Sequence, residues 1–485
     1  MNKPLRRIAL FCGILILALL VRTNYLQYVR ADELNTRDEN RRVQIERYAH
    51  ERGNIIVDGE PVTGSVETKG SDFKYKRVWK NGPMWAPVTG YSSQAFDASQ
   101  LESIEDGILT GNSDQLFFDR TLSMFTGEKK TGGNIVTTLN AAAQKAAFKG
   151  LGDNKGAVAA IDPQTGAILA LASTPSYDPS VFAGNSMKDS EARQKLLNDK
   201  DKPMLNRALR ETYPPGSTFK IVTASAALEN GLYTDVDAKT DSPLPWKLPQ
   251  TSGPLQNEGN IPCLNASLRE ALRWSCNTVF GKISDDLGNE KMIEEANKFG
   301  FNKEIFTPVR ADASVYPKDN APQNAMAGIG QASNRATPLQ MAMVAAAVAN
   351  DGKLMQPYMV AERQAPNLDV IYTHEKEQLS QPLSAENAQK VQQIMETVVK
   401  EGTGTNAQIP GVTVGGKTGT AQHGLNNSEK PYAWFISYAK TDSGSPVAVA
   451  VVVEDGKANR DDISGGGLAA PIAKDVMKAV LDGKR

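Results

Sequence analysis

The segment that decides the fold is residues 211–231, ETYPPGSTFKIVTASAALENG. The Pro-Pro-Gly triplet at 214–216 ends the preceding element, because two prolines and a glycine cannot continue a helix or a strand. Ser217 is a good N-cap residue and the Asn-Gly pair at 230–231 is a typical helix end, so we predict a helix of about three turns between them. Its residues are apolar almost all round, which indicates a buried helix.

Ser217 and Lys220 stand at the start of this helix. Side chains three residues apart lie on the same face of a helix, so the hydroxyl and the amine share a face. Such a pair is either a cap beside a lysine or a nucleophile beside its general base. The rest of the chain has to distinguish these two interpretations.

The composition is that of a globular protein with more than one domain. The chain has 485 residues, of which 40% are hydrophobic and 22% charged. Lys plus Arg is 54 and Asp plus Glu is 55, so no charge excess favours a nucleic-acid partner. The three histidines and three cysteines lack metal-ligand spacing, and we expect neither a metal site nor a cofactor.

The N-terminus has the pattern of a membrane segment. MNKPLRR carries three basic residues, and residues 8–21, IALFCGILILALLV, carry no charge. This pattern fits a cleaved signal peptide or, extended through Tyr25 and Tyr28, an uncleaved membrane helix. No small-x-small cleavage motif follows. We therefore predict a single-pass anchor in the cytoplasmic (inner) membrane, with the N-terminus inside and everything after about residue 30 outside.

Three regions follow from the pattern along the chain. Residues 1–30 form the cytoplasmic tip and the transmembrane anchor, and residues 31–140 combine a charged stalk with short β-like runs. Residues 141–485 contain a predicted hairpin, then helices, then strands and a closing helix, an order that predicts an α+β domain. The elements expected there are a helix after Asn140, a hairpin over 156–173, helices over 264–300 and 337–352, strands over 412–421, 433–440 and 446–455, and a helix over 471–483.

Short motifs have to be judged by their context. Ser-x-x-Lys occurs at 71–74, 217–220 and 437–440. The first and last lie in strand-like runs, where residues three apart point to opposite faces. Lys-Thr-Gly occurs in the turn-like KKTGG at 129–133 and in a strand pattern at 417–419, and Ser-x-Asn occurs once, at 275–277. Only Ser217, Ser275 and Lys417 therefore satisfy both context and the order SxxK, SxN, KTG.

This ordered triple is the signature of the penicillin-recognising serine enzymes. The segments NRALRETYPPGSTFK, GAVAAIDPQTGAILALASTPSYDPSVF, GIGQASNRATPLQMA, KTGTAQ and HERGNII resemble those of class B penicillin-binding proteins. The resemblance extends from the anchor to about residue 480, and the short N-terminal module makes the chain most similar to actinobacterial members. It implies an antiparallel five-stranded sheet flanked by helices in residues 141–485, and a dimerisation-type module in residues 31–140.

Within that resemblance, five residues have catalytic roles: Ser217, Lys220, Ser275, Asn277 and Lys417. Ser217 is the nucleophile, and Lys220 is its base once burial and the Lys417 cation lower its pKa. Ser275 relays a proton toward the leaving nitrogen. Asn277 hydrogen-bonds a substrate amide and orients Lys220.

The KTG strand supplies the predicted substrate contacts. Thr418 and Thr420 bind the substrate carboxylate, and Gly419 lets the substrate backbone pair with the strand. By resemblance, the backbone N–H groups of Ser217 and Thr420 form the oxyanion hole.

The resemblance implies a monofunctional peptidoglycan D,D-transpeptidase that β-lactams acylate. The donor is a stem peptide ending in D-Ala–D-Ala, the acceptor is an amine of a second stem, and the family works beside a polytopic lipid II polymerase. A D,D-carboxypeptidase, a β-lactamase and a non-catalytic penicillin-sensing or scaffold protein remain alternatives. A β-lactamase is disfavoured because no E-x-x-x-N loop lies between SxxK and KTG, and a scaffold because every catalytic residue is present.

The cysteines leave one question open. Cys263 and Cys276 are either a disulfide or two buried thiols, and an oxidising compartment permits the bond. Cys12 lies in the apolar N-terminal segment and is interpreted as a membrane-helix residue.

Overall fold

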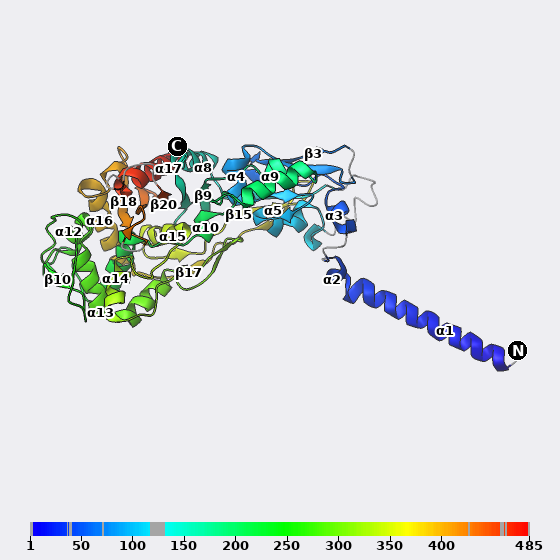
Figure 1. Cartoon of the computed structure of the whole chain (residues 1–485), viewed down its shortest axis with the longest axis horizontal. Helices are drawn as coiled ribbons and strands as arrows, with labels where there is room; N and C mark the ends of the chain where they lie inside the picture. The colour runs from blue at the N-terminus through cyan, green and yellow to red at the C-terminus, as the bar shows by residue number, and fades with distance from the viewer. Residues whose placement is uncertain are drawn as a thin grey trace.

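The computed structural model describes residues 3–35, 37, 41–69, 72–116, 131–424, 427–455, 460 and 463–483. An isolated N-terminal helix, a middle region rich in short strands and a larger C-terminal domain follow one another along the long axis (Figure 1). The helix comprises α1 (Lys3–Asn24) and η1 (Tyr25–Val29), and none of its residues is buried. Lys3–Val29 contains an 18-residue window with a mean hydropathy of 2.1 and is a candidate membrane span by length and composition, a test that a signal sequence also passes.

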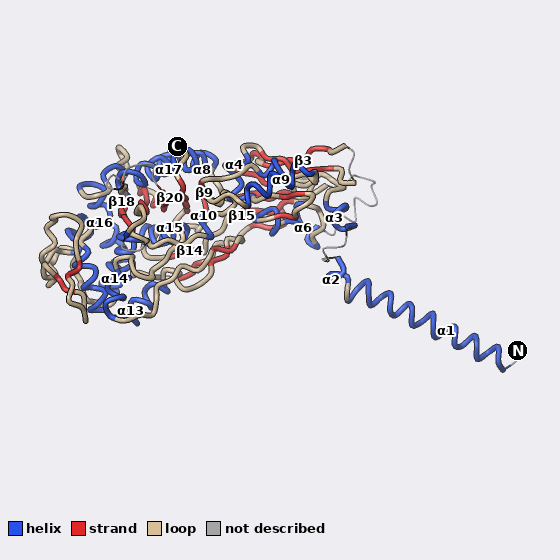
Figure 2. The backbone as a smooth tube through the Cα atoms, in the orientation of Figure 1, coloured by secondary structure: helices blue, strands red, loops and turns tan. Residues whose placement is uncertain are grey.

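The middle region is built around a sheet of order β16-β15-β7-β1-β2. Its strands are β1 (Ile55–Val57), β2 (Glu60–Pro61), β7 (Asn134–Thr137), β15 (Val360–Gln364) and β16 (Val370–Thr373). Strands β15 and β16 come from late in the chain. Strand β15 pairs antiparallel with β7. Two segments more than two hundred residues apart therefore share one sheet, and Figure 2 shows these strands beside the C-terminal domain.

Short elements complete this middle region. They are α2 (Ala31–Asn35), α3 (Arg41–Arg47), β3 (Thr63–Glu67), β4 (Tyr75–Trp79), α4 (Gly82–Thr89), β5 (Ser92–Ser93), β6 (Asp97–Ala98), α5 (Gln100–Ile104), α6 (Asp106–Leu109), η2 (Asp114–Leu116) and, from later in the chain, η3 (Pro179–Phe182) and α9 (Met187–Leu197). Tyr177 and Phe182 pack on Ala86 of α4, and Leu196 of α9 joins them.

The C-terminal domain contains a five-stranded antiparallel sheet of order β18-β19-β20-β8-β9. Its strands are β8 (Lys155–Ile161), β9 (Ile168–Thr174), β18 (Thr413–Ala421), β19 (Tyr432–Thr441) and β20 (Gly444–Asp455). The predicted hairpin, the three late strands and the α+β class are confirmed. Strand β18, which carries the KTG motif, is an edge strand of this sheet.

Helices cover both faces of the sheet, as the almost continuous burial of its strands requires. On one face α8 (Ala141–Leu151) and α17 (Ala470–Gly483) pack on residues such as Phe435 and Val451. On the other face α11 (Lys220–Glu229) and α15 (Pro338–Ala349) share a core with Trp434 and Ile436. The central strands are therefore apolar on both faces, which explains the almost unbroken apolar run of β20.

The predicted helices after Asn140, over 264–300, over 337–352 and over 471–483 are confirmed. The side chain of Asn140 accepts a hydrogen bond from the Ala143 N–H at 2.8 Å, and Thr337 caps α15 in the same way. The remaining elements are α10 (Arg207–Arg210), η4 (Gly216–Phe219), β10 (Trp246–Lys247), β11 (Pro254–Leu255), α12 (Leu268–Trp274), α13 (Asn277–Lys298), β12 (Ile305–Phe306), β13 (Arg310–Ala311), α14 (Ala321–Gly328), β14 (Leu354–Met355), β17 (Gln378–Ser380), α16 (Ala385–Glu401), η5 (Thr405–Ala407) and η8 (Gly465–Ala469).

Two local predictions are wrong. Ser217 does not cap a helix: it lies inside the 3-10 turn η4, and α11 begins only at Lys220. The segment Asp72–Lys74 is not a strand, because β4 begins at Tyr75. Ser71 of the same motif, and Lys129 and Lys130 of the first Lys-Thr-Gly motif, lie outside the described residues.

Candidate active site

The turn that carries Ser217 is fixed by contacts on both sides. Gly216 has a φ of +54°, a conformation that favours glycine, and its N–H donates to the Gly330 carbonyl at 2.9 Å. A Cβ at Gly216 would approach Ala421, at the end of β18, to 3.1 Å. The Trp434 indole N–H donates to the Pro214 carbonyl at 3.1 Å. Ser217 therefore lies directly beside the end of the KTG strand.

The Ser-x-Asn motif occupies the junction between α12 and α13. Ser275 adopts the left-handed conformation (φ 62°, ψ 42°) that ends α12, and Asn277 begins α13. Asn257 Oδ1 accepts from the Asn277 N–H at 2.7 Å, so an amide side chain satisfies the first turn of α13. Between these residues, the structure joins Cys276 to Cys263 in a disulfide.

The three motifs meet at the Ser275 hydroxyl. Lys417 Nζ lies 2.9 Å from Ser275 Oγ, and Lys220 Nζ lies 3.3 Å from the same oxygen. Lys220 Nζ also donates to the Ser275 carbonyl and to Asn277 Oδ1, both at 2.7 Å. Two lysines from distant segments are thus hydrogen-bonded to one serine, and the three motifs lie together.

Burial and like charge determine the protonation of these lysines. Both are 0% exposed. Burial lowers the pKa of Lys220 well below 10.5, and the neighbouring Lys417 cation lowers it further. Burial lowers the pKa of Lys417 to about 7, against an opposing contribution from Glu258. Lys220 is therefore the group best suited to be neutral near pH 7, which a general base must be.

In the KTG motif, Thr418 is held by a side-chain contact and Gly419 by close packing. Thr418 is nearly buried, and its hydroxyl lies 2.6 Å from the hydroxyl of Thr403. A Cβ at Gly419 would approach Thr218 Cγ2 to 3.0 Å and the Pro215 carbonyl oxygen to 3.1 Å. A side chain at this position would therefore press on the Ser217 turn. Because β18 is an edge strand, its outer side has no strand partner in the described part of the chain.

A cavity of about 440 Å³ lies next to these groups. Its lining includes Ser217, Asn277 and Thr420. Two charged residues, Glu258 and Arg460, also line it. The predicted nucleophile, the SxN asparagine and the predicted oxyanion-hole strand residue therefore border one space in which a substrate carbonyl can lie.

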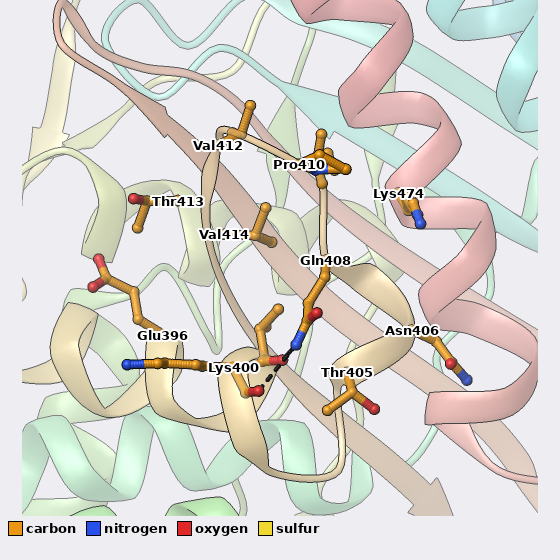
Figure 3. Close-up of a pocket in the computed structure, with 12 residues that line it drawn as sticks. Glu396, Lys400, Thr405, Asn406, Gln408, Pro410, Val412, Thr413, Val414 and Lys474 are labelled. Carbon is orange, nitrogen blue, oxygen red and sulfur yellow. Dashed lines mark hydrogen bonds between the residues drawn. The ribbon is translucent and has the colours of Figure 1, made fainter.

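A larger cavity, of about 890 Å³, lies elsewhere on the domain (Figure 3). It is lined by residues of α16, η5, the start of β18 and α17, including Lys400 and Lys474. Gln408 Nε2 donates to the carbonyls of Val399 and Lys400, both at 2.9 Å. None of the SxxK, SxN or KTG residues lines this cavity. The convergence of polar groups, and not the volume, therefore identifies the site.

Sequence reasoning missed three residues of the site. Asn257 and Glu258 lie in a loop without periodic pattern, and Thr403 lies in the turn after α16. A polar loop residue has no sequence signal that tells which distant strand or helix it will contact. Among the described residues, no group of three or more His, Cys, Asp or Glu side chains could hold a metal ion.

Comparison with known proteins gives consistent matches. Residues 156–478 match the penicillin binding protein transpeptidase domain, and residues 52–135 match the penicillin binding protein A dimerisation domain. The chain is 38% identical over 493 residues to the peptidoglycan D,D-transpeptidase PbpA of Mycolicibacterium smegmatis, covering 99% of both chains. It is 39% identical over 496 residues to the protein of the same name from Mycobacterium tuberculosis, covering 100% of both.

Solved structures are similar as well. The ceftriaxone acyl-enzyme complex of penicillin-binding protein A from M. tuberculosis matches with a TM-score of 0.85 and 38% identity, over 90% of this chain and 100% of that chain. The penicillin G acyl-enzyme complex of the same protein matches with a TM-score of 0.83 and 38% identity, over 89% and 100%.

Proposed function

We propose that this chain, which belongs to the penicillin-binding protein transpeptidase family, is a peptidoglycan D,D-transpeptidase that β-lactams acylate on Ser217. The resemblance to class B penicillin-binding proteins, and to actinobacterial penicillin-binding protein A in particular, is confirmed. One observation carries the assignment of roles: Lys220 and Lys417 are both hydrogen-bonded to Ser275, in a buried site beside Ser217.

The proposed acylation step uses these groups. Neutral Lys220 removes the proton from Ser217 Oγ as the oxygen attacks the carbonyl between the two D-alanines. The N–H groups of Ser217 and Thr420 stabilise the oxyanion. The Oγ–C bond forms, the C–N bond breaks, and the proton passes from Lys220 through Ser275 to the departing D-Ala amine. Lys220 is neutral again afterwards, so the site can act a second time.

Transfer uses the same groups in reverse. The amine of a second stem attacks the acyl-enzyme, and its surplus proton passes through Ser275 and Lys220 to Ser217 Oγ as that oxygen leaves. Lys417, Thr418 and Thr420 hold the terminal carboxylate of the donor, and the free edge of β18 pairs with the donor backbone.

The decisive test is labelling of the full-length chain in detergent with a fluorescent penicillin. We expect a covalent adduct that is stable for hours, is lost in Ser217→Ala and is kept in Ser437→Ala, the serine of the other Ser-x-x-Lys pair in β19. An adduct that disappears within minutes would instead identify a β-lactamase. Release of D-Ala without transfer to an amine would identify a carboxypeptidase, and a folded chain that is never labelled would be the scaffold alternative.

We also propose the location of this chemistry. Lys3–Val29 would anchor the chain in the cytoplasmic membrane with its basic N-terminus inside, and the catalytic domain would face peptidoglycan outside, near a polytopic lipid II polymerase. Protease added to intact spheroplasts should remove the catalytic domain. Protection of that domain would show the opposite orientation.

A further inference from the structure

The active-site cavity has an acidic side chain that the steps above do not use. Glu258 lines the cavity of about 440 Å³ together with Ser217 and Asn277. Among the described residues that line the cavity, it is the one carboxylate. It forms no ion pair or hydrogen bond with any other described residue, so its charge is available to a ligand.

The backbone on both sides of Glu258 is tied to the catalytic turn. The Gln256 carbonyl accepts from Asn277 Nδ2 at 2.8 Å. Asn257 Oδ1 accepts from the N–H groups of Asn277 and Thr278, at 2.7 and 3.1 Å. The disulfide from Cys263 to Cys276 closes the same loop. The loop that presents this carboxylate is therefore held in place relative to the active-site groups.

Neither catalytic lysine neutralises Glu258. Its negative charge raises the pKa of Lys220 and of Lys417, but burial outweighs this contribution and both pKa values stay lowered. The lysines themselves donate to Ser275, Asn277 and Thr418. The other charged wall residue, Arg460, donates to Gln422 Oε1 and to backbone carbonyls of Asn427 and Glu429.

We propose that Glu258 binds the ammonium group of the acceptor stem peptide, an inference that rests on the proposed function. An aliphatic amine in water is protonated, with a pKa of about 10.4. The donor presents a carboxylate to the KTG strand, so the cation that the reaction must bring to the cavity is the acceptor. A fixed carboxylate raises the local concentration of that cation and directs it toward the acyl-enzyme.

The proton balance keeps Glu258 ionised throughout. The bound ammonium first releases one proton to water. The neutral nitrogen then forms the C–N bond while the C–Oγ bond to Ser217 breaks. Its second proton passes through Ser275 and Lys220 to Ser217 Oγ. Glu258 is in this scheme a binding residue for the acceptor and not the base.

The test separates acceptor binding from acylation. The full-length chain in detergent receives a diacetyl-lysyl-D-alanyl-D-lactate donor, which carries no amine. The acceptor is either Nα-acetyl-lysine amide, an ammonium near neutral pH, or hydroxylamine, which is uncharged there. Glu258→Gln is compared with Glu258→Asp and with Glu290→Gln, an exposed glutamate on α13 outside the cavity.

In Glu258→Gln we expect the KM for the lysine acceptor to rise about fivefold with little change in kcat, since an exposed charge pair contributes up to about 1 kcal/mol. Transfer to hydroxylamine and acylation by penicillin should stay within about twofold. Glu258→Asp should recover most of the lysine transfer, Glu290→Gln should match the wild type, and added salt should weaken lysine binding only where the carboxylate is present.

Equal KM values for the lysine acceptor in the wild type and Glu258→Gln would overturn the inference. So would a parallel loss of penicillin acylation or of hydroxylamine transfer, because Glu258 would then act on the catalytic lysines or on folding. Both results leave amine transfer by the wild type intact. A wild type that is acylated but transfers to neither acceptor would overturn the transpeptidase proposal together with this inference.

Discussion

Two buried clusters in this molecule each contain a pair of basic residues, and they differ in what lies between them. In the middle region Arg52 and Arg77 share the Glu102 carboxylate, at 2.6 Å each. In the C-terminal domain Lys220 and Lys417 share the Ser275 hydroxyl. A carboxylate compensates buried positive charge and a hydroxyl does not. The first cluster is therefore suited to hold structure, and the second to chemistry.

The pKa of Arg52 follows this difference, whereas burial lowers the pKa of Arg77 in spite of the Glu102 charge. Burial by itself lowers the pKa of Arg52. The charges of Glu102 and Asp106 together outweigh burial, so the pKa of Arg52 lies above its ordinary value. No carboxylate contacts either lysine among the described residues, so burial and mutual repulsion lower the pKa of Lys220. A buried amine that has lost its charge near neutral pH is a base, whereas a guanidinium held charged is not.

The cluster of Arg52, Arg77 and Glu102, here called the paired cluster, lies beside a contact that joins distant parts of the chain. Arg363 of β15 donates to both carboxylate oxygens of Glu105, at 2.8 and 2.9 Å, next to the helix that carries Glu102. The strand that enters the middle region from the C-terminal half is thus held by an ion pair as well as by its ladder to β7.

The largest effect is expected when the cluster of Lys220, Lys417 and Ser275, here called the reactive cluster, is disrupted. Lys220→Met removes the proposed base, and we expect penicillin acylation to fall about 10⁴-fold, or roughly 5 kcal/mol in activation free energy. The free energy of unfolding should stay equal or increase, since a buried amine without a counter-charge is replaced by an apolar chain. Lys440→Met, the lysine of the Ser-x-x-Lys pair in β19, is the control and should acylate normally. Stopped-flow labelling and urea denaturation measure both quantities.

The reverse pattern is expected in the paired cluster. Glu102→Gln leaves Arg77 and Arg52 buried without their shared counter-charge, which should lower the free energy of unfolding by about 3–5 kcal/mol. The folded fraction should still be acylated within about twofold of the wild-type rate. Glu67→Gln, at an exposed end of β3, should change neither quantity. A large loss of acylation with unchanged stability would contradict the division of roles between the clusters.

The reactive cluster is held by a covalent bond instead of ion pairs. Replacing Cys263 and Cys276 by serine opens a loop with a sequence separation of 13, and should lower the free energy of unfolding by about 3 kcal/mol. Cys12→Ser, at the exposed cysteine of α1, should not change it. Thiol titration of the denatured, unreduced chain should find only Cys12 reactive. Three reactive thiols would mean that the bond is absent.

The smallest effect concerns stability as a function of pH. The unfolded chain keeps the Lys417 proton up to about pH 10.4, while the folded chain releases it at about pH 7. Between these values the unfolded state binds more protons, so the free energy of unfolding should rise with pH, by about 1 kcal/mol per pH unit for one such proton. In Lys417→Met the rise between pH 7 and pH 9 should be smaller. Equal slopes in both proteins would show that folding does not lower the pKa of Lys417.

Sequence reasoning was most reliable where a pattern is local. The hairpin at β8 and β9, the helix capped by Asn140 and the buried helix α15 each follow from residues that are neighbours in the chain. It failed at Ser217, where the residue types of an N-cap are present but the packing of Gly216 against Gly330 and Ala421 imposes a 3-10 turn. The contribution of β15 to the middle sheet was not predicted either, because strand pairing over such a separation leaves no local signal.

By itself, the sequence determined the chemical inventory of this protein: one serine and one lysine in a helix-starting context, followed in order by SxN and KTG, and an apolar N-terminal segment. Those features depend only on residue type and on spacing along the chain. Only the tertiary structure decided that Lys417 and Lys220 meet at one hydroxyl, that Gly419 packs closely against the Ser217 turn, and that Glu258 lines the same cavity as Ser217. Protonation, burial and close approach depend on neighbours in space. These neighbours lie in segments that are far apart along the chain, so no local sequence pattern predicts them.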